Sequence, residues 1–177
     1  LRQLSTPVER RRSGGSGIYY HLSYWGEPQD YLWLSSTSPA LVASEMGKAL
    51  AFGADRIWIA NVGDIKPAEL ETQFFLDLAR TPSRWTPETA ADYPRQWAAE
   101  IFGDALAEPI ARIKLDYYRL NQSPKPEHLL NFPFTRDEMT HRLGACQELL
   151  ASLAAIDPQI PERLRDAWFE LVAYPVE

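Results

Sequence analysis

The feature that most constrains this fold is an apolar run over residues 57–62 (IWIANV). A strand with one solvent face alternates apolar and polar residues, whereas a strand of a parallel sheet is covered on both faces and is apolar throughout. The run therefore predicts a strand of a parallel α/β sheet that is buried on both faces. Asn61 interrupts the run near its end, and Gly63 and Asp64 follow Val62, so polar groups stand at its carboxyl end.

Strand and helix signals alternate around this run. Residues 17–24 (GIYYHLSY) are rich in aromatic and β-forming residues and predict an earlier strand. Between the two strands we expect a helix that is capped by Ser38 and stopped by Gly53. A second helix is expected to begin at Pro67. Because the order is strand, helix, strand, helix, the strands should be parallel and the helices should be their crossover connections.

The second half of the chain carries helix signals and no strand signal. Helical stretches are expected from Thr86, again after Pro94, and over residues 106–120. Thr135 and Glu138 have the spacing of a capping box. The stripe expected to be buried on the helix that follows is Met139, Leu143, Cys146, Leu150 and Leu153. This half is predicted to be a small helical bundle.

Two strand–helix units do not complete a sheet, because their outer strands leave open edges. A closed (β/α)₈ barrel needs roughly 250 residues, and the chain has 177. We therefore predict an α/β part followed by an all-α part. Residues 1–85 would be the C-terminal part of a (β/α)₈ barrel, and residues 86–177 an incomplete helical bundle. Since the chain begins at Leu1 rather than at a methionine, we expect a fragment or a processed product.

Composition argues against several classes of function. The formal net charge of −6 disfavours nucleic acid or an anionic membrane as the main partner. No apolar run is long enough to span a bilayer. The one cysteine, Cys146, rules out an internal disulfide framework, and the three histidines lie too far apart in the sequence to indicate a metal site.

Polar and aromatic residues follow both predicted strands, where parallel α/β proteins gather their functional groups. His21, Tyr24 and Trp25 end the first strand. Asn61 and Asp64 end the second. Aromatic rings stack on sugars, polar groups bond to hydroxyls, and paired carboxylates cleave glycosidic bonds, so one interpretation is a carbohydrate site. The other interpretation is structural. Asp64 would hold a turn or cap a helix, and Asn61 would bond to loop backbone. His21 would lie in the core, and the two aromatic residues would be ordinary packing residues.

Four segments carry a family resemblance. They are residues 14–34 (GGSGIYYHLSYWGEPQDYLWL), 54–79 (ADRIWIANVGDIKPAELETQFFLDLA), 93–103 (YPRQWAAEIFG) and 165–176 (RDAWFELVAYPV). Together they resemble glycoside hydrolase family 115, the xylan α-1,2-glucuronidases. The resemblance implies a multidomain enzyme in which a catalytic (β/α)₈ barrel precedes a helical bundle.

The resemblance also implies a reaction and a set of site residues. The reaction is hydrolysis, with inversion, of the bond that links glucuronic acid or its 4-O-methyl ether to xylan, and it needs no cofactor and no metal. The family's strand-end pattern falls on His21, Tyr24, Trp25 and Asn61, which we expect to bind the substrate, and we expect Asp64 to be catalytic. The substrate would be glucuronoxylan or its oligosaccharides.

Further expectations concern the parent protein. We expect it to be extracytoplasmic, either periplasmic or secreted, and the full-length enzyme is a candidate homodimer. This chain alone is expected to be inactive, because the earlier barrel strands are absent from it. The alternative hypothesis is a non-catalytic helical binding or scaffold module, in which the strand-end residues only close a loop.

Overall fold

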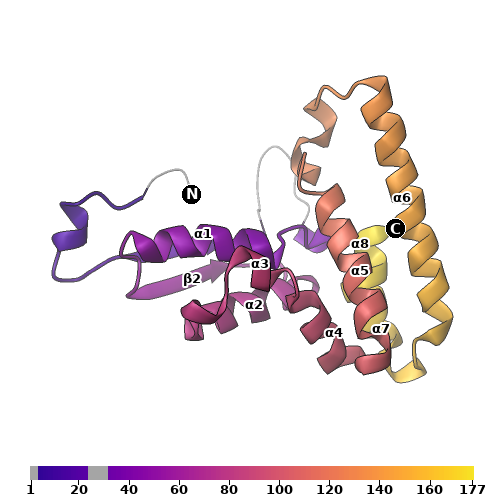
Figure 1. Ribbon diagram of the computed structural model, residues 1–177, viewed down its shortest axis with the longest axis horizontal. Helices are drawn as coiled ribbons and strands as arrows, with labels where there is room; N and C mark the ends of the chain where they lie inside the picture. The colour runs from indigo at the N-terminus through magenta and orange to yellow at the C-terminus, as the bar shows by residue number, and fades with distance from the viewer. Residues whose placement is uncertain (1–3, 24–31) are drawn as a thin grey trace.

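The computed structural model describes residues 4–23 and 32–177, so Tyr24 and Trp25 lie outside the described residues. A small α/β part is followed by a helical part (Figure 1). The strands and helices are β1 (Gly17–His21), α1 (Pro39–Ala51), β2 (Ile57–Asn61), α2 (Glu69–Arg80), α3 (Pro87–Ala90), α4 (Tyr93–Phe102), α5 (Asp104–Leu120), α6 (Arg136–Ile156), α7 (Arg165–Trp168) and α8 (Tyr174–Val176). Short turns that matter below are the 3₁₀ turns η2 (Leu32–Leu34) and η3 (Lys66–Ala68) and the π-helical turn η8 (Phe169–Ala173).

The α/β part has the predicted order and the predicted helix signals. β1 and β2 pair in parallel, with His21 opposite Asn61 at their carboxyl ends. Ser38 caps α1, because its Oγ accepts a hydrogen bond from the backbone N–H of Leu41 at 3.3 Å. Gly53 follows α1 with a φ of +85°, a left-handed conformation that glycine adopts without a steric penalty. The predicted start and stop of this helix are confirmed.

The two-stranded sheet is covered on one face only. Tyr20 and Trp58 point toward the apolar core, where their ring centroids lie 6.1 and 5.8 Å from that of Phe75. On the opposite face, Ile57 is 59% exposed and Ile59 is 43% exposed. The prediction that β2 is buried on both faces is therefore wrong for this chain, because its described residues cover a single face of the sheet.

The helical part is built around large aromatic side chains. Trp97 on α4 and Trp168 on α7 are almost fully buried and both meet the ring of Phe102 edge-on, at centroid distances of 5.9 and 6.3 Å. One continuous apolar cluster extends from this region into α1 and α2, where it includes Met46 and Phe74. Among the described residues, no helix combines the length and the apolar character that crossing a membrane requires.

Helix α6 lies at the outer side of the helical part, next to α5 (Figure 1). Its predicted capping box is confirmed. Thr135 Oγ1 accepts from the backbone N–H of Glu138 at 3.2 Å, and the Glu138 carboxylate accepts from the backbone N–H of Thr135 at 2.8 Å. These bonds satisfy N–H groups that the first turn of a helix leaves without a partner.

The buried stripe predicted for α6 is largely wrong. Met139, Leu143 and Leu150 are 40%, 57% and 42% exposed. Of the predicted stripe only Leu153 is buried, and Leu149, which was not predicted, is buried beside it. Apolar residues at helical spacing identify a face of a helix, but they do not say whether a neighbour covers that face.

Asp157 joins the end of α6 to α7. Its Oδ1 accepts hydrogen bonds from Arg165 Nη1 at 3.0 Å and from Trp168 Nε1 at 2.9 Å. The bond from Arg165, followed by that from Trp168, lowers the pKa of the Asp157 carboxyl. The ionised carboxylate is therefore the form that the folded chain favours.

We expect Asp157→Asn to lower the melting temperature at neutral pH. Because the folded-state pKa lies below the unfolded value of about 3.9, the stabilisation is present above that value and is lost as the pH falls through the folded-state pKa. The difference in melting temperature between wild type and variant should therefore narrow in acid. Melting curves between about pH 7 and pH 3 check this, with Asp166→Asn, an exposed change on α7, as the control. A difference that stays constant over this range would contradict the assignment.

Candidate functional site

The carboxyl ends of β1 and β2 lie side by side, and β2 runs toward the helical part (Figure 1). Beyond the paired His21 and Asn61, the backbone N–H of Leu22 donates to the Asn61 carbonyl at 3.0 Å. The N–H of Gly63 donates to Ser23 Oγ at 2.6 Å, which ties the two outgoing loops together. The register therefore brings His21 and Asn61, both predicted site residues, to one edge of the sheet.

These side chains lie on the open face of the sheet. Residues two apart in a strand share a face, so Tyr19 and His21 lie on the same side of β1. Asn61 Nδ2 donates a hydrogen bond to Tyr19 Oη, and the Tyr19 and His21 rings meet edge-on with centroids 5.3 Å apart. A phenol, an imidazole and an amide thus form one exposed polar group.

Tyr19 was not predicted as a site residue. Its signal in the sequence is its position two residues before His21, which places both on the same face of a strand. The side chain is 57% exposed although it is aromatic and belongs to a strand. The structure therefore adds the hydroxyl and the aromatic face of Tyr19 to His21 and Asn61. These three residues are called the strand-end group below.

Asp64 lies in the loop between β2 and η3 and is half-buried. Neither η3 nor α2 has a side-chain cap, so Asp64 does not cap the helix that follows it. No hydrogen bond or ion pair joins its carboxylate to another residue in the part of the chain that the structure describes. Its position in the sequence is three residues after Asn61.

The strand-end group and Asp64 contain some of the chemical groups that a glycosidase uses. The phenol, imidazole and amide can donate and accept the hydrogen bonds that sugar hydroxyls require. Glycosidic hydrolysis with inversion needs two carboxyl groups, and Asp64 can supply one. Within residues 4–23 and 32–177, no three histidine, cysteine or carboxylate side chains gather closely enough to hold a metal ion.

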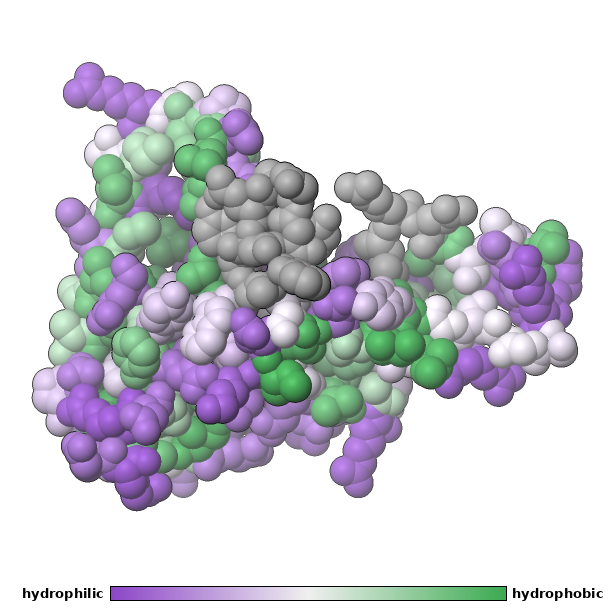
Figure 2. Space-filling model, turned by 180° about the vertical axis from the view of Figure 1, so that it is seen from behind, coloured by the Kyte–Doolittle hydropathy of each residue, from purple (hydrophilic) through white to green (hydrophobic). Residues whose placement is uncertain are grey.

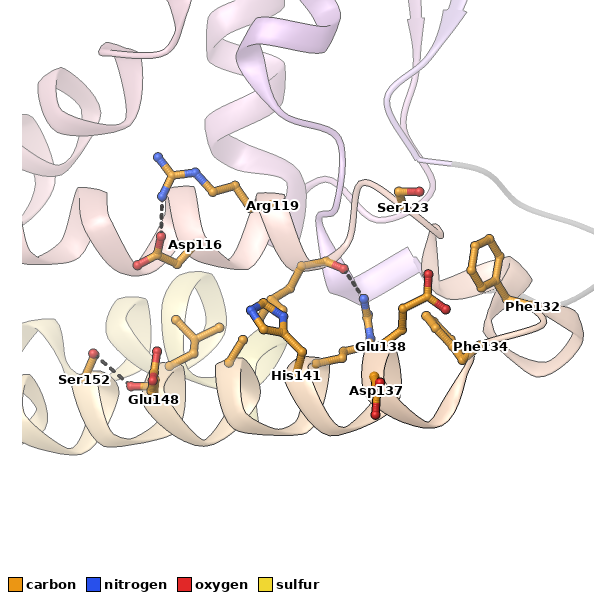
Figure 3. Close-up of a pocket in the computed structure, with 14 residues that line it drawn as sticks. Asp116, Arg119, Ser123, Phe132, Phe134, Asp137, Glu138, His141, Glu148 and Ser152 are labelled. Atoms are coloured by element: carbon orange, nitrogen blue, oxygen red, sulfur yellow. Dashed lines mark hydrogen bonds and ion pairs between the residues drawn. The ribbon is translucent and has the colours of Figure 1, made fainter.

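A separate groove of about 830 Å³ lies between α5 and α6 (Figure 3). Phe132 and Phe134 stand at one end, with ring centroids 4.6 Å apart. Most of its basic groups are already engaged. Arg119 pairs with Asp116 at 2.5 Å, and Arg142 donates to a backbone carbonyl at the end of α5 at 2.5 Å. Of the predicted site residues that the structure describes, none lines this groove.

Apolar side chains reach the surface on both parts of the molecule, among hydrophilic ones (Figure 2). On the α/β part they include Ile57 and Ile59 of the open sheet face. On the helical part they include Met139, Leu143 and Leu150 of α6. The sequence pattern predicted these five positions to be buried, although other apolar residues such as Leu130 and Ile65 are more exposed still.

Comparison with known proteins identifies the class. A sequence profile described as glycosyl hydrolase family 115 matches residues 1–128. A solved structure, that of BtGH115A, a novel family GH115 4-O-methyl-α-glucuronidase with specificity for decorated arabinogalactans, is 36% identical in sequence and has a TM-score of 0.89. No curated protein matches the sequence.

The solved glucuronidase is the larger of the two chains. The similarity covers 99% of this chain and 25% of the glucuronidase chain, so this chain spans about a quarter of that protein's length. These matches place the chain in a class of glycosyl hydrolases. The chain belongs to glycosyl hydrolase family 115, which confirms the resemblance seen in its sequence.

We expect Tyr19→Phe to release the Asn61 amide. The variant loses the oxygen that accepts from Asn61 Nδ2 and keeps the ring that meets His21. The free energy of unfolding should fall by at most about 0.5–1.5 kcal/mol, which is the net contribution of one hydrogen bond. The measurement is the position of the Asn61 side-chain amide signals in a ¹H–¹⁵N spectrum, which should shift clearly.

Tyr20→Phe is the matched control. Tyr20 lies on the other face of β1, and burial raises the pKa of its hydroxyl to about 12. Removing that hydroxyl should leave the Asn61 side-chain signals in place. Equal shifts in the two variants would show that the Tyr19–Asn61 bond does not form in solution.

Proposed function

We propose that this chain is part of a glycoside hydrolase that removes α-1,2-linked (4-O-methyl)glucuronic acid side chains from xylan with inversion. The observation that carries the proposal is the pairing of His21 with Asn61 at the strand ends, with Asp64 in the loop that follows. Membership of family 115 supports the reaction class. The substrate would be glucuronoxylan or its oligosaccharides. The specificity of the solved relative makes decorated arabinogalactans the competing substrate.

The proposed architecture places residues 1–85 in a (β/α)₈ barrel and residues 86–177 in a helical bundle. In such a barrel the helices cover the outside, and the inner face of each strand packs against side chains from other strands. The open face formed by Tyr19, Ile57 and Ile59 is the face that would point inward. The exposed apolar side chains of this face support the proposal that it is covered by other barrel strands, which lie outside this chain.

Each strand-end residue has a proposed role. His21, Asn61 and Tyr19 would bond to sugar hydroxyls, and Tyr24 and Trp25 would stack on sugar rings. Asp64 would be one of the two carboxyl groups that inversion needs, roughly 6.5–9.5 Å apart with a water between them. The second would come from another strand of the barrel.

The 177-residue chain alone should not release glucuronic acid from glucuronoxylan. Inversion needs both carboxyl groups, and the proposal assigns only one of them to this chain. The assay is product release by purified chain, with the full-length enzyme as the positive control. Turnover by the isolated chain above the background of a heat-denatured sample would contradict the proposal.

In the full-length enzyme that contains this chain, Asp64→Asn should reduce turnover more than Asn61→Ala. Loss of a group that acts as acid or base costs on the order of 100-fold or more, whereas Asn61→Ala removes hydrogen bonds to the sugar. Both variants should keep a melting temperature close to that of the wild type. Steady-state kinetics and thermal melts, measured on the same samples, test this expectation.

Asp55→Asn is the control for the loss of a carboxylate. Asp55 is an exposed residue that precedes β2, so it lies at the opposite end of the same strand from Asp64. The change should leave turnover unaltered. If Asp64→Asn lowers the melting temperature and leaves turnover of the folded enzyme intact, Asp64 only holds its loop, and the catalytic assignment is wrong.

The competing function is a non-catalytic binding or scaffold module. The groove between α5 and α6 favours it, together with the exposed apolar side chains of α6, because such surfaces mark sites of interaction. In that case neither Asp64→Asn nor Asn61→Ala would affect any hydrolytic activity. The same kinetic comparison therefore separates the two functions.

A further inference from the structure

A buried carboxylate on α2 joins the two parts of the molecule. Glu71, in the first turn of α2, is 1% exposed. Its Oε1 accepts hydrogen bonds from Ser35 Oγ at 2.5 Å and from Tyr118 Oη at 2.7 Å. Ser35 directly follows η2, and Tyr118 belongs to α5. One side chain therefore connects the segment before α1, the start of α2 and the helical part.

The segment that Glu71 holds has an unusual backbone. Ser35 is 6% exposed and has a φ of +49°, in the left-handed region that few residues other than glycine adopt. Such a conformation persists only where surrounding contacts hold it. The hydrogen bond to Glu71 is one of these contacts.

The helical part supplies the other contacts to the same segment. Tyr117 Oη donates to the carbonyl of Leu34, the last residue of η2. Lys125 Nζ donates to the Ser36 carbonyl at 2.6 Å and lies 3.3 Å from Thr37 Oγ1. Residues on both sides of Ser35 are thus fixed by side chains from α5 and from the connection that follows α5.

A buried cation extends this network to the C-terminal turn η8. Lys114 on α5 is 2% exposed, and its Nζ donates to the Leu171 carbonyl at 3.2 Å. The Nζ also lies 5.2 Å from the ring centroid of Tyr118. Burial lowers the pKa of Lys114, and the charge of Glu71 opposes that shift. The second oxygen of Glu71, Oε2, has no hydrogen-bond partner among the described residues, so Oε1 accepts both of the hydrogen bonds that hold this side chain.

The network holds the two turns that pack against η3, the turn that follows the Asp64 loop. That loop leads into η3, and η3 is followed directly by α2, which carries Glu71. On its other sides η3 packs against η2 and η8. η2 ends at Leu34 and η8 contains Leu171, and both residues are bonded by the network. The position of η3 therefore depends on these buried polar contacts, and η3 fixes the end of the loop that carries Asp64.

We propose that Glu71 is a positioning residue, which fixes η2 and the start of α2 against the helical part and thereby sets the position of Asp64. The role of Asp64 rests on the proposed function, whereas the ordering of residues 62–68 rests only on the contacts of Glu71. The two statements need separate measurements.

The first measurement is amide hydrogen exchange on the 177-residue chain. Glu71→Gln keeps the size of the side chain and removes its charge, and Ser35→Ala removes one donor to it. Both variants should speed exchange in residues 62–68, by about tenfold for Glu71→Gln and by less for Ser35→Ala. If Glu71→Gln does not fold, Ser35→Ala alone decides the outcome.

Tyr93→Phe is the matched control. It removes the 2.7 Å hydrogen bond from Tyr93 Oη to Asp77, which also links α2 to the helical part but near the other end of α2. Its effect should be confined to the end of α2 and the start of α4. Exchange in residues 62–68 that rises no more in Glu71→Gln than in Tyr93→Phe overturns the inference.

The second measurement is steady-state kinetics of the full-length enzyme. Glu71→Gln should lower kcat by about tenfold or more and leave KM nearly unchanged, because a misplaced catalytic group affects the transition state rather than substrate binding. Tyr93→Phe should leave kcat unchanged even where it lowers the melting temperature equally. An unchanged kcat in Glu71→Gln overturns the positioning role. A wild-type enzyme without glucuronidase activity overturns the proposed function and leaves the exchange result as the test of Glu71.

Discussion

The parallel pairing of β1 with β2 is the constraint on which the candidate site depends. It sets His21 opposite Asn61, and a shift of one residue would turn the strand-end side chains to the core face. The close approach at Gly17 helps to fix this register. A Cβ at that position would lie 2.4 Å from Ile57 Cγ2 and 2.5 Å from the Ile57 carbonyl oxygen. Only glycine therefore fits the start of β1. The register that is fixed there also aligns the site residues at the other end of the strands.

The junction between the two parts uses buried charge where apolar packing would also be stable. Removing the charged groups of Glu71 and Lys114 from water costs free energy, and their mutual attraction offsets that cost only where the geometry is good. Proteins with apolar replacements of similar size are often equally stable. Hydrogen bonds are directional, however, and apolar contacts are not. The network therefore defines one arrangement of η2, α2 and η8, in a region where the backbone leads into the candidate site.

Local signals in the sequence predicted the elements well, because caps and strand order are local properties. Ser38, Gly53 and the Thr135–Glu138 pair act at the ends of their helices as expected. Burial was predicted less well, since it depends on neighbours that a local pattern does not contain. Ile59 of β2 is exposed for this reason. Nothing in the sequence around Glu71 marks it as buried, because a charged residue in the first turn of a helix is usually solvated.

The two-stranded sheet has a consequence for how the isolated chain behaves in solution. Among the described residues β1 and β2 pair only with each other, so each has an outer edge of unpaired backbone groups. Such edges template pairing with strands of other molecules, and exposed apolar side chains such as Ile57 favour it further. Self-association of the chain therefore competes with its folding, and protein concentration becomes a variable in any measurement of its stability.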